Sequence, residues 1–193
     1  MIKPDNNSHI NPHDYWKIDN YIPSYICDEI IKNHDNLKQA GVTAYVGAEK
    51  EINDTRKSEI EWIKTPFYLN LVFDIFRRVN DKFQFDIETI ESLQLTRYTA
   101  PDGQYDFHID SNGYSRKRVD QPVRKLSMSC LLNDSDDFDG GVFQMNVSSD
   151  IYDIKLNKGD LIIFPSYFRH RVTPVTRGTR YSLVAWACGK PFR

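Results

Sequence analysis

Residues 126–133 have the sequence LSMSCLLN, and this stretch decides the fold class. Side chains two positions apart in a strand point to the same face of a sheet. One face of this stretch is therefore apolar and carries Leu126, Met128, Cys130 and Leu132. The opposite face carries Ser127, Ser129 and Leu131. This alternation predicts a strand with one fully apolar face and one more polar face.

Six further stretches between residues 92 and 187 also predict strands, because they are short, rich in strand-forming residues and separated by turn signals. They are residues 92–99, 142–147, 151–156, 160–164, 170–175 and 180–187. The turn signals are Asp139-Gly140-Gly141, Asn157-Lys158-Gly159 and Arg177-Gly178. Short strands at this spacing, with no helix between them, predict a β-sandwich or a β-barrel.

Two helices are predicted before these strands. Ser24 follows Pro23 and can cap a helix that runs to about Leu37. Thr65-Pro66 places an N-cap residue and an N1 proline before a periodic apolar pattern over residues 67–83. We therefore predict a mainly β protein with flanking α: a double-stranded β-helix (jelly roll) preceded by two helices that pack on one sheet face. Residues 1–193 form one domain in this prediction, with a helical supporting region at 1–89 and the jelly-roll core at 90–193.

Composition narrows the class of partner. The 193 residues are 40% hydrophobic and 13% aromatic, which is enough to build a core. A net charge of -2 without a basic stripe predicts no nucleic-acid partner. No apolar run approaches 18 residues and the N-terminal residues are polar, so neither a membrane span nor a signal peptide is expected. Three cysteines without a C-x-x-C pair predict a reduced, cytoplasmic compartment. The oligomeric state is left open.

The segment His108-Ile109-Asp110 and the later His170 form a candidate metal site. In a strand, His108 and Asp110 face one side while Ile109 points away. Two imidazoles and one carboxylate are the ligands of non-haem iron(II) oxygenase sites and leave coordination positions open. Zinc bound by the same residues is an alternative, and so is an ordinary histidine without a metal.

Arg180 and Ser182 share one face of the last predicted strand, shortly after His170. A guanidinium forms a bidentate pair with a carboxylate, and a serine hydroxyl adds a further donor. The two side chains therefore predict a binding site for an acidic co-substrate beside the metal. An ion pair between Arg180 and a surface carboxylate is the alternative.

Several blocks of the chain, in this order, resemble the 2-oxoglutarate- and iron(II)-dependent dioxygenases and, within them, the prolyl 4-hydroxylase-like branch. The blocks are residues 97–110, 124–133, 138–143, 158–166, 170–172 and 180–186. The resemblance covers residues 90–193, about half of the chain, and extends weakly to Arg56-Lys57-Ser58. The chain differs from many prolyl hydroxylases at two positions: they have lysine where this chain has Arg180, and a threonine near the position of Phe143. Some of them also have histidine where this chain has Cys188.

The resemblance implies roles for nine residues. His108, Asp110 and His170 match the iron(II) ligands. Arg180, Ser182 and Tyr98 match residues that hold 2-oxoglutarate. Tyr105, Arg124 and Trp186 match positions that border the target. Core packing is the alternative for the three aromatic residues, and a plain surface charge is the alternative for Arg124.

The implied cofactors are Fe(II), 2-oxoglutarate and O2, with ascorbate as a candidate reductant. The implied reaction is hydroxylation of an unactivated C–H bond, with a prolyl residue in a peptide or protein as the foremost substrate. The alternatives are the same chemistry on a free amino acid or small metabolite, or a non-oxygenase jelly-roll module that binds a metal. Residues 111–122 are predicted to border the substrate entrance, and residues 45–62 are predicted to form the opposite wall.

Overall fold

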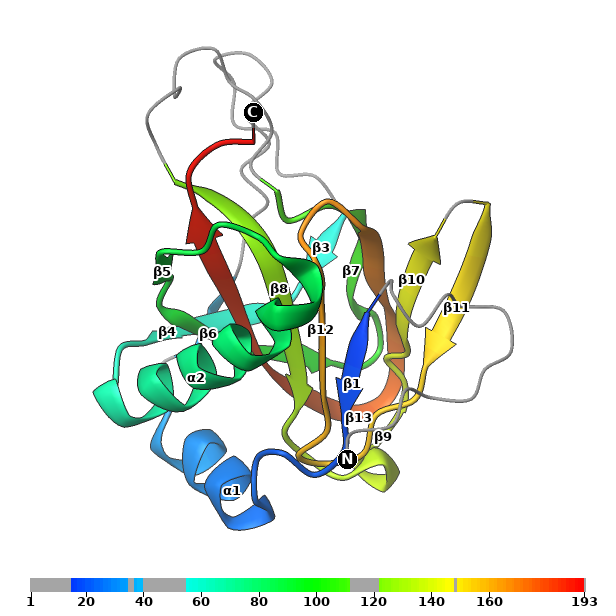
Figure 1. Cartoon of the computed structure of the whole chain (residues 1–193). Helices are drawn as coiled ribbons and strands as arrows, with labels where there is room; N and C mark the ends of the chain where they lie inside the picture. The colour runs from blue at the N-terminus through cyan, green and yellow to red at the C-terminus, as the bar shows by residue number, and fades with distance from the viewer. Residues whose placement is uncertain (1–14, 35–36, 40–54, 112–121, 148, 193) are drawn as a thin grey trace, which may run out of the picture.

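A computed structural model describes residues 15–34, 37–39, 55–111, 122–147 and 149–192 of the chain. The fold consists of two antiparallel sheets that share one long strand, with two helices packed outside one of them (Figure 1). The structure is mostly β, so the predicted jelly-roll class is confirmed.

The larger sheet contains eight strands, and Figure 1 shows it behind the helices. Its strand order is β1 (Trp16–Ile18), β12 (Leu161–Pro165), β8 (Val123–Leu131), β13 (Arg169–Gly189), β6 (Leu93–Thr99), β4 (Glu59–Ile63) and β2 (Lys38–Gln39), with β5 (Thr89–Ile90) pairing with the end of β13. The smaller sheet has the order β11 (Asp150–Ile154), β10 (Phe143–Val147), β13, β7 (Gly103–His108) and β3 (Arg56–Lys57), with β9 (Phe138–Gly140) also pairing with β13 after the short 3-10 helix Ser135–Asp137.

Strand β13 corrects one prediction. Residues 170–175 and 180–187 were expected to be two strands separated by a turn at Arg177-Gly178, but they form one continuous strand. Gly178 pairs with β9 of the smaller sheet, and the next residue, Thr179, pairs with β6 of the larger sheet. Gly178 has a φ of 70°, which glycine adopts without steric cost. The predicted turn is therefore a corner at which one strand passes between the sheets.

The outer face of the larger sheet forms the main core with helices α1 (Ser24–Asn33) and α2 (Pro66–Phe83). The helices lie side by side on that face in Figure 1. Strand β8 contributes Leu126, Met128 and Cys130 to this core, and Leu132, just beyond the end of the strand, also belongs to it. The alternation in the sequence predicted this apolar face. Helix α1 ends at Asn33, earlier than the predicted end near Leu37. Helix α2 begins at the predicted proline, Pro66, and its C-cap residue Gln84 has a left-handed backbone conformation.

A second apolar cluster lies between the two sheets. It includes Tyr98 from β6, Phe164 from β12, and Phe143 and Met145 from β10. The inner face of the larger sheet is polar farther along the strands, where Gln94, Ser129 and Ser182 face the space between the sheets. The fold therefore places one apolar core under the helices and one partly polar cavity inside the jelly roll.

The N-terminal half also supplies strands that the sequence did not predict. β1 pairs with β12, β4 pairs with β6, and β3 pairs with β7. Residues before 90 therefore extend both sheets in addition to forming helices, and the division into a supporting region and a core stays a prediction. Within the described residues, neither helix combines the length and the apolar character that a membrane crossing requires.

Candidate functional site

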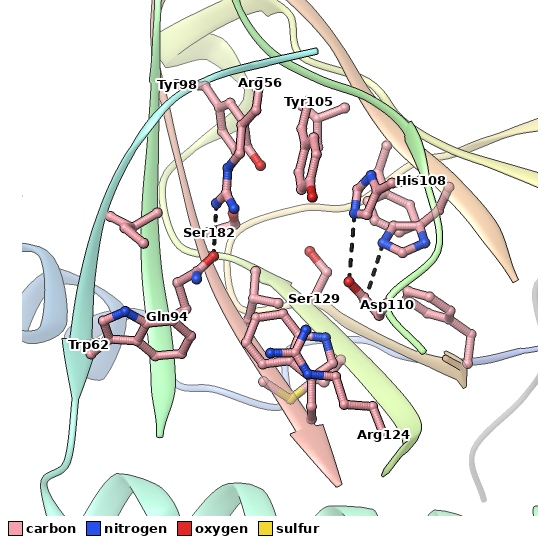
Figure 2. A pocket seen from close by; sticks show the side chains of 18 residues that line it. Arg56, Trp62, Gln94, Tyr98, Tyr105, His108, Asp110, Arg124, Ser129 and Ser182 are labelled. Carbon is pink, nitrogen blue, oxygen red and sulfur yellow. Dashed lines mark hydrogen bonds and ion pairs between the residues drawn. The ribbon is translucent and has the colours of Figure 1, made fainter. Parts of the chain in front are cut away.

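A cavity of about 420 Å³ opens between the two sheets, a volume typical of small-molecule sites. Figure 2 shows side chains from both sheets converging on it. Eight of the nine predicted site residues line it, and Arg180 does not. The eight are Tyr98, Tyr105, His108, Asp110, Arg124, His170, Ser182 and Trp186.

The three candidate metal ligands meet at one end of the cavity. Asp110 Oδ1 lies 3.6 Å from His108 Nε2, and Asp110 Oδ2 lies 3.4 Å from His170 Nε2 (Figure 2). One ligand atom from each residue lies within 4.8 Å of the other two. In the described part of the chain, this is the one cluster of three such side chains close enough to share a metal ion.

Both imidazoles are held in the orientation that a metal requires. His108 Nδ1 lies 2.8 Å from the carbonyl oxygen of Asp106, and His170 Nδ1 lies 3.0 Å from that of Phe168. A carbonyl oxygen only accepts, so each Nδ1 carries the proton and donates it. Each Nε2 then presents a lone pair toward Asp110, which is the tautomer that hydrogen-bonded metal-ligand histidines adopt.

Asp110 lies just beyond the end of β7 and not within it, because β7 ends at His108. The amide N–H groups of Asp110 and Ser111 both donate to the carbonyl oxygen of Ser166, at 2.9 Å each. The Ser166 hydroxyl is buried and lies 2.9 Å from the hydroxyl of Ser127 on β8. The loop after β12 therefore fixes the carboxylate, while Ile109 points outward as predicted and is 52% exposed.

Electrostatics keeps the cluster in the charge state that binds a cation. Burial, with a smaller contribution from His170, lowers the pKa of His108 to about 4. For Asp110, burial alone would raise the pKa, but His170 and His108 outweigh it and hold the pKa below its ordinary value. A neutral His108 imidazole and an ionised Asp110 carboxylate are therefore available near neutral pH.

Arg180 lies behind the cavity wall. Its residue surface is 1% exposed to solvent. Its Cζ lies 5.7 Å from the centre of the Tyr98 ring, and Tyr98 lines the cavity. Its Nη1 is buried and has no hydrogen-bond partner among the described residues. A buried guanidinium nitrogen without a partner is costly, so an anion that reached it from the cavity would relieve that cost.

Arg124 and Trp186 form a stacked pair on the opposite side of the cavity. The guanidinium of Arg124 lies 3.7 Å from the centre of the Trp186 ring and forms a bidentate ion pair with Glu91, at 2.8 and 2.6 Å. Trp62 lies 6.0 Å from Trp186, ring centre to ring centre, and is 45% exposed. These side chains form an aromatic and cationic part of the cavity wall.

Sequence reasoning missed several residues of the site. Gln94 and Ser129 line the cavity, yet neither was assigned a role. Arg56, Ile60 and Trp62 lie in the predicted wall segment 45–62, and all three line the cavity; residues 45–54 of that wall lie outside the described residues. Residues 112–121 of the predicted entrance loop also lie outside the described residues.

The donor set fits a divalent iron ion and a dicarboxylate. Two nitrogen donors and one carboxylate on one side of a metal leave positions for a bidentate ligand and dioxygen. Tyr98 and Ser182 line the same cavity, and the buried Arg180 lies beside Tyr98 with its Nη1 unpartnered among the described residues, so these three side chains could hold the far carboxylate of that ligand.

Comparison with known proteins agrees with this geometry. The family model described as "2OG-Fe(II) oxygenase superfamily" matches residues 93–188, about half of the chain. A PKHD-type hydroxylase of Pseudomonas fluorescens is 37% identical over 90 residues, which are 46% of this chain and 39% of the relative. A PKHD-type hydroxylase of Hyphomonas neptunium is 34% identical over 99 residues, which are 51% of this chain and 43% of the relative. The match thus spans about two fifths of these relatives' length.

Solved structures show the same fold over nearly the whole chain. A prolyl-4-hydroxylase of Pseudomonas putida superposes with a TM-score of 0.70 at 20% identity, covering 93% of this chain and 94% of its own. A prolyl hydroxylase from Trichoplax adhaerens, solved with a peptide fragment, superposes with a TM-score of 0.72 at 19% identity, covering 91% and 83%. With the family match over β6 to β13 and the triad that those strands assemble, the chain belongs to the 2OG-Fe(II) oxygenase superfamily.

Proposed function

We propose that this protein is an iron(II)- and 2-oxoglutarate-dependent dioxygenase that hydroxylates an unactivated C–H bond. The observation that supports it best is the convergence of His108 Nε2, His170 Nε2 and the Asp110 carboxylate, in a fold that also buries Arg180 with an Nη1 that has no hydrogen-bond partner among the described residues. A metal-binding module without oxygen chemistry needs the triad but has no use for a buried cation behind it.

In this proposal His108, Asp110 and His170 hold the iron. Arg180, with Ser182 and Tyr98, holds the distal carboxylate of 2-oxoglutarate. When bound, iron(II), 2-oxoglutarate and O2 supply the oxidising chemistry. The chain supplies the geometry: the backbone carbonyls of Asp106 and Phe168 fix the two imidazoles, and Ser166 fixes Asp110.

For the substrate we propose a prolyl residue in a peptide or protein, bordered by Tyr105, Arg124 and Trp186. The prolyl hydroxylase folds among the structural neighbours support this class, and Tyr105, Arg124 and Trp186 all line the cavity that holds the triad. The unpaired, buried cysteines support a reducing compartment such as the cytoplasm, and ascorbate is the reductant to include in an assay.

The test is succinate formation from 2-oxoglutarate with iron(II) and O2, followed by NMR, with proline-containing peptides monitored by mass for the gain of one oxygen atom. Asp110→Ala removes the only carboxylate of the triad and is expected to lower succinate formation by more than about 100-fold, since ligand loss exceeds the effect of losing an outer-shell partner. Asp139→Ala, an exposed carboxylate on β9, is the matched control. Undiminished succinate in Asp110→Ala contradicts the proposed ligand role.

A further inference from the structure

Arg56 on β3 is a cation of the cavity wall that the proposed iron and 2-oxoglutarate sites do not use. It pairs in register with Tyr105 of β7, and its guanidinium lies 4.5 Å from the centre of the Tyr105 ring. Nε donates to the Ser58 hydroxyl at 2.8 Å. Nη2 donates to Gln94 Oε1 at 2.8 Å, as Figure 2 shows. The ring and the two hydrogen bonds fix the guanidinium in one orientation at the cavity.

Both hydrogen-bond acceptors of Arg56 are neutral. Two carboxylates in this part of the fold have other partners: Glu59 pairs with Arg97 at 2.6 Å, and Asp102 pairs with Lys57. Among the described residues, no carboxylate forms an ion pair with Arg56. Arg124, the other arginine that lines the cavity, differs because Glu91 neutralises it through two hydrogen bonds.

The charge of Arg56 remains unbalanced when the proposed ligands are bound. Iron(II) and Arg180 together balance Asp110 and the two carboxylates of 2-oxoglutarate, and Glu91 balances Arg124. Among the described residues that line the cavity, Arg56 then carries the remaining net charge. A guanidinium that is partly removed from water and held in a fixed orientation favours a carboxylate partner, which it can bind with two parallel hydrogen bonds.

We propose that Arg56 binds a carboxylate of the primary substrate, so that the enzyme selects an anionic substrate over its neutral counterpart. This inference rests on the proposed function, because the substrate must lie beside an occupied metal centre. The carboxylate has two possible sources: the free α-carboxylate of a small amino-acid derivative, or an acidic side chain next to the target residue in a peptide.

The experiment compares matched pairs of probes by calorimetry, with anaerobic protein loaded with iron(II) and 2-oxoglutarate. One pair is N-acetyl-proline and N-acetyl-prolinamide. The other is a blocked proline-containing peptide with aspartate beside the proline and the same peptide with asparagine. Wild type is expected to bind the anionic member of at least one pair about 10- to 100-fold more tightly, as expected for charge-assisted hydrogen bonds. The pair that shows the preference identifies the source.

Arg56→Gln is expected to reduce this preference to less than about threefold, whereas Arg56→Lys keeps part of it because the charge remains. Lys57→Gln is the control: it removes the same charge from the adjacent residue of β3, whose partner Asp102 is exposed. Circular dichroism establishes that each variant is folded, and Arg56→Lys keeps the test decisive if Arg56→Gln does not fold.

Three results overturn the inference while the proposed function stands: equal binding within both pairs, a preference that persists in Arg56→Gln, or a loss of 2-oxoglutarate binding in that variant. The last would mean that Arg56 holds the co-substrate. If iron-loaded wild type fails to bind 2-oxoglutarate at all, the proposed function itself is wrong and the inference falls with it.

Discussion

At the scale of single residues, the site depends on backbone carbonyls as much as on its side chains. Each imidazole donates Nδ1–H to the carbonyl two residues before it, which belongs to Asp106 within β7 for His108 and to Phe168 just before β13 for His170. The histidines therefore cannot rotate without losing a hydrogen bond. This holds Nε2 toward Asp110 before any metal arrives and reduces the entropy that binding costs.

The cysteines give a residue-scale prediction. Burial raises the pKa of Cys27 to about 11 and that of Cys188 to about 12. Burial also raises the pKa of Cys130 well above its ordinary value. Because the thiolate is the reactive form, iodoacetamide at pH 8 is expected to leave all three thiols unmodified in the folded protein. Mass spectrometry should find three additions after unfolding in urea. Rapid alkylation of any cysteine in the folded chain contradicts this.

The raised thiol pKa values also determine how the free energy of unfolding changes with pH. Between pH 9 and about pH 11 the unfolded chain ionises thiols that the folded chain keeps protonated, so the free energy of unfolding falls as the pH rises.

The structure brings the three residues of the predicted triad together, and their role as metal ligands stays a prediction; the sequence predicted their surroundings only in part. The spacing of His108 and Asp110 suffices to place both near one metal, even though Asp110 lies beyond the strand. Arg56 gave no local signal, because β3 has two residues and shows no periodicity. Its position in the cavity wall depends on pairing with Tyr105, which lies 49 positions away in sequence.

At the scale of elements, β13 positions the site. This strand carries His170 in the smaller sheet and Arg180, Ser182 and Trp186 in the larger sheet. The corner at Gly178 sets the angle between the two halves and so the separation of the proposed metal and carboxylate sites. The glycine also passes close to the 3-10 segment, where a Cβ would lie 1.9 Å from the carbonyl oxygen of Asp137.

Gly178→Ala is therefore expected to lower the free energy of unfolding by about 2 kcal/mol or more, because the left-handed φ and the contact with Asp137 both penalise a side chain. Urea denaturation measures the change. Thr176→Ala, at an exposed position of the same strand, should change it by less than about 0.5 kcal/mol. Equal stability of Gly178→Ala and wild type would contradict the role of this corner.

Element prediction succeeded where periodicity extended over many residues and failed where pairing alone defines a strand. The apolar spacing of α2 and the alternation of β8 were sufficient to identify both elements. Strands β1, β2, β3 and β5 are two or three residues long and exist because a neighbouring strand offers hydrogen bonds. At the corner of β13, the local signal of Arg177-Gly178 could not distinguish a chain reversal from a bend within one strand.

At the scale of the whole molecule, the helices stabilise the sheet that bears the site. The larger sheet has its cavity on one face and α1 and α2 on the other, so the apolar core under the helices holds the strands from behind. Phe76 of α2 is fully buried in this core, whereas Phe67 of the same helix is 60% exposed.

Phe76→Ala is expected to lower the free energy of unfolding by about 3–5 kcal/mol, since it removes a buried aromatic side chain and leaves a cavity. Phe67→Ala should cost less than about 1 kcal/mol. Chemical denaturation followed by circular dichroism compares the two variants. If both substitutions cost the same, α2 does not support the sheet in the manner described.

The central claim is that iron(II) and 2-oxoglutarate bind together between the triad and Arg180. The most direct test is the visible spectrum of the anaerobic protein, recorded after iron(II) and then 2-oxoglutarate are added. We predict a weak charge-transfer band for wild type and for Arg177→Ala, an exposed arginine of the same strand, and a lost or weakened band for Arg180→Ala. No band in iron-loaded wild type, or an undiminished band in Arg180→Ala, would contradict the account.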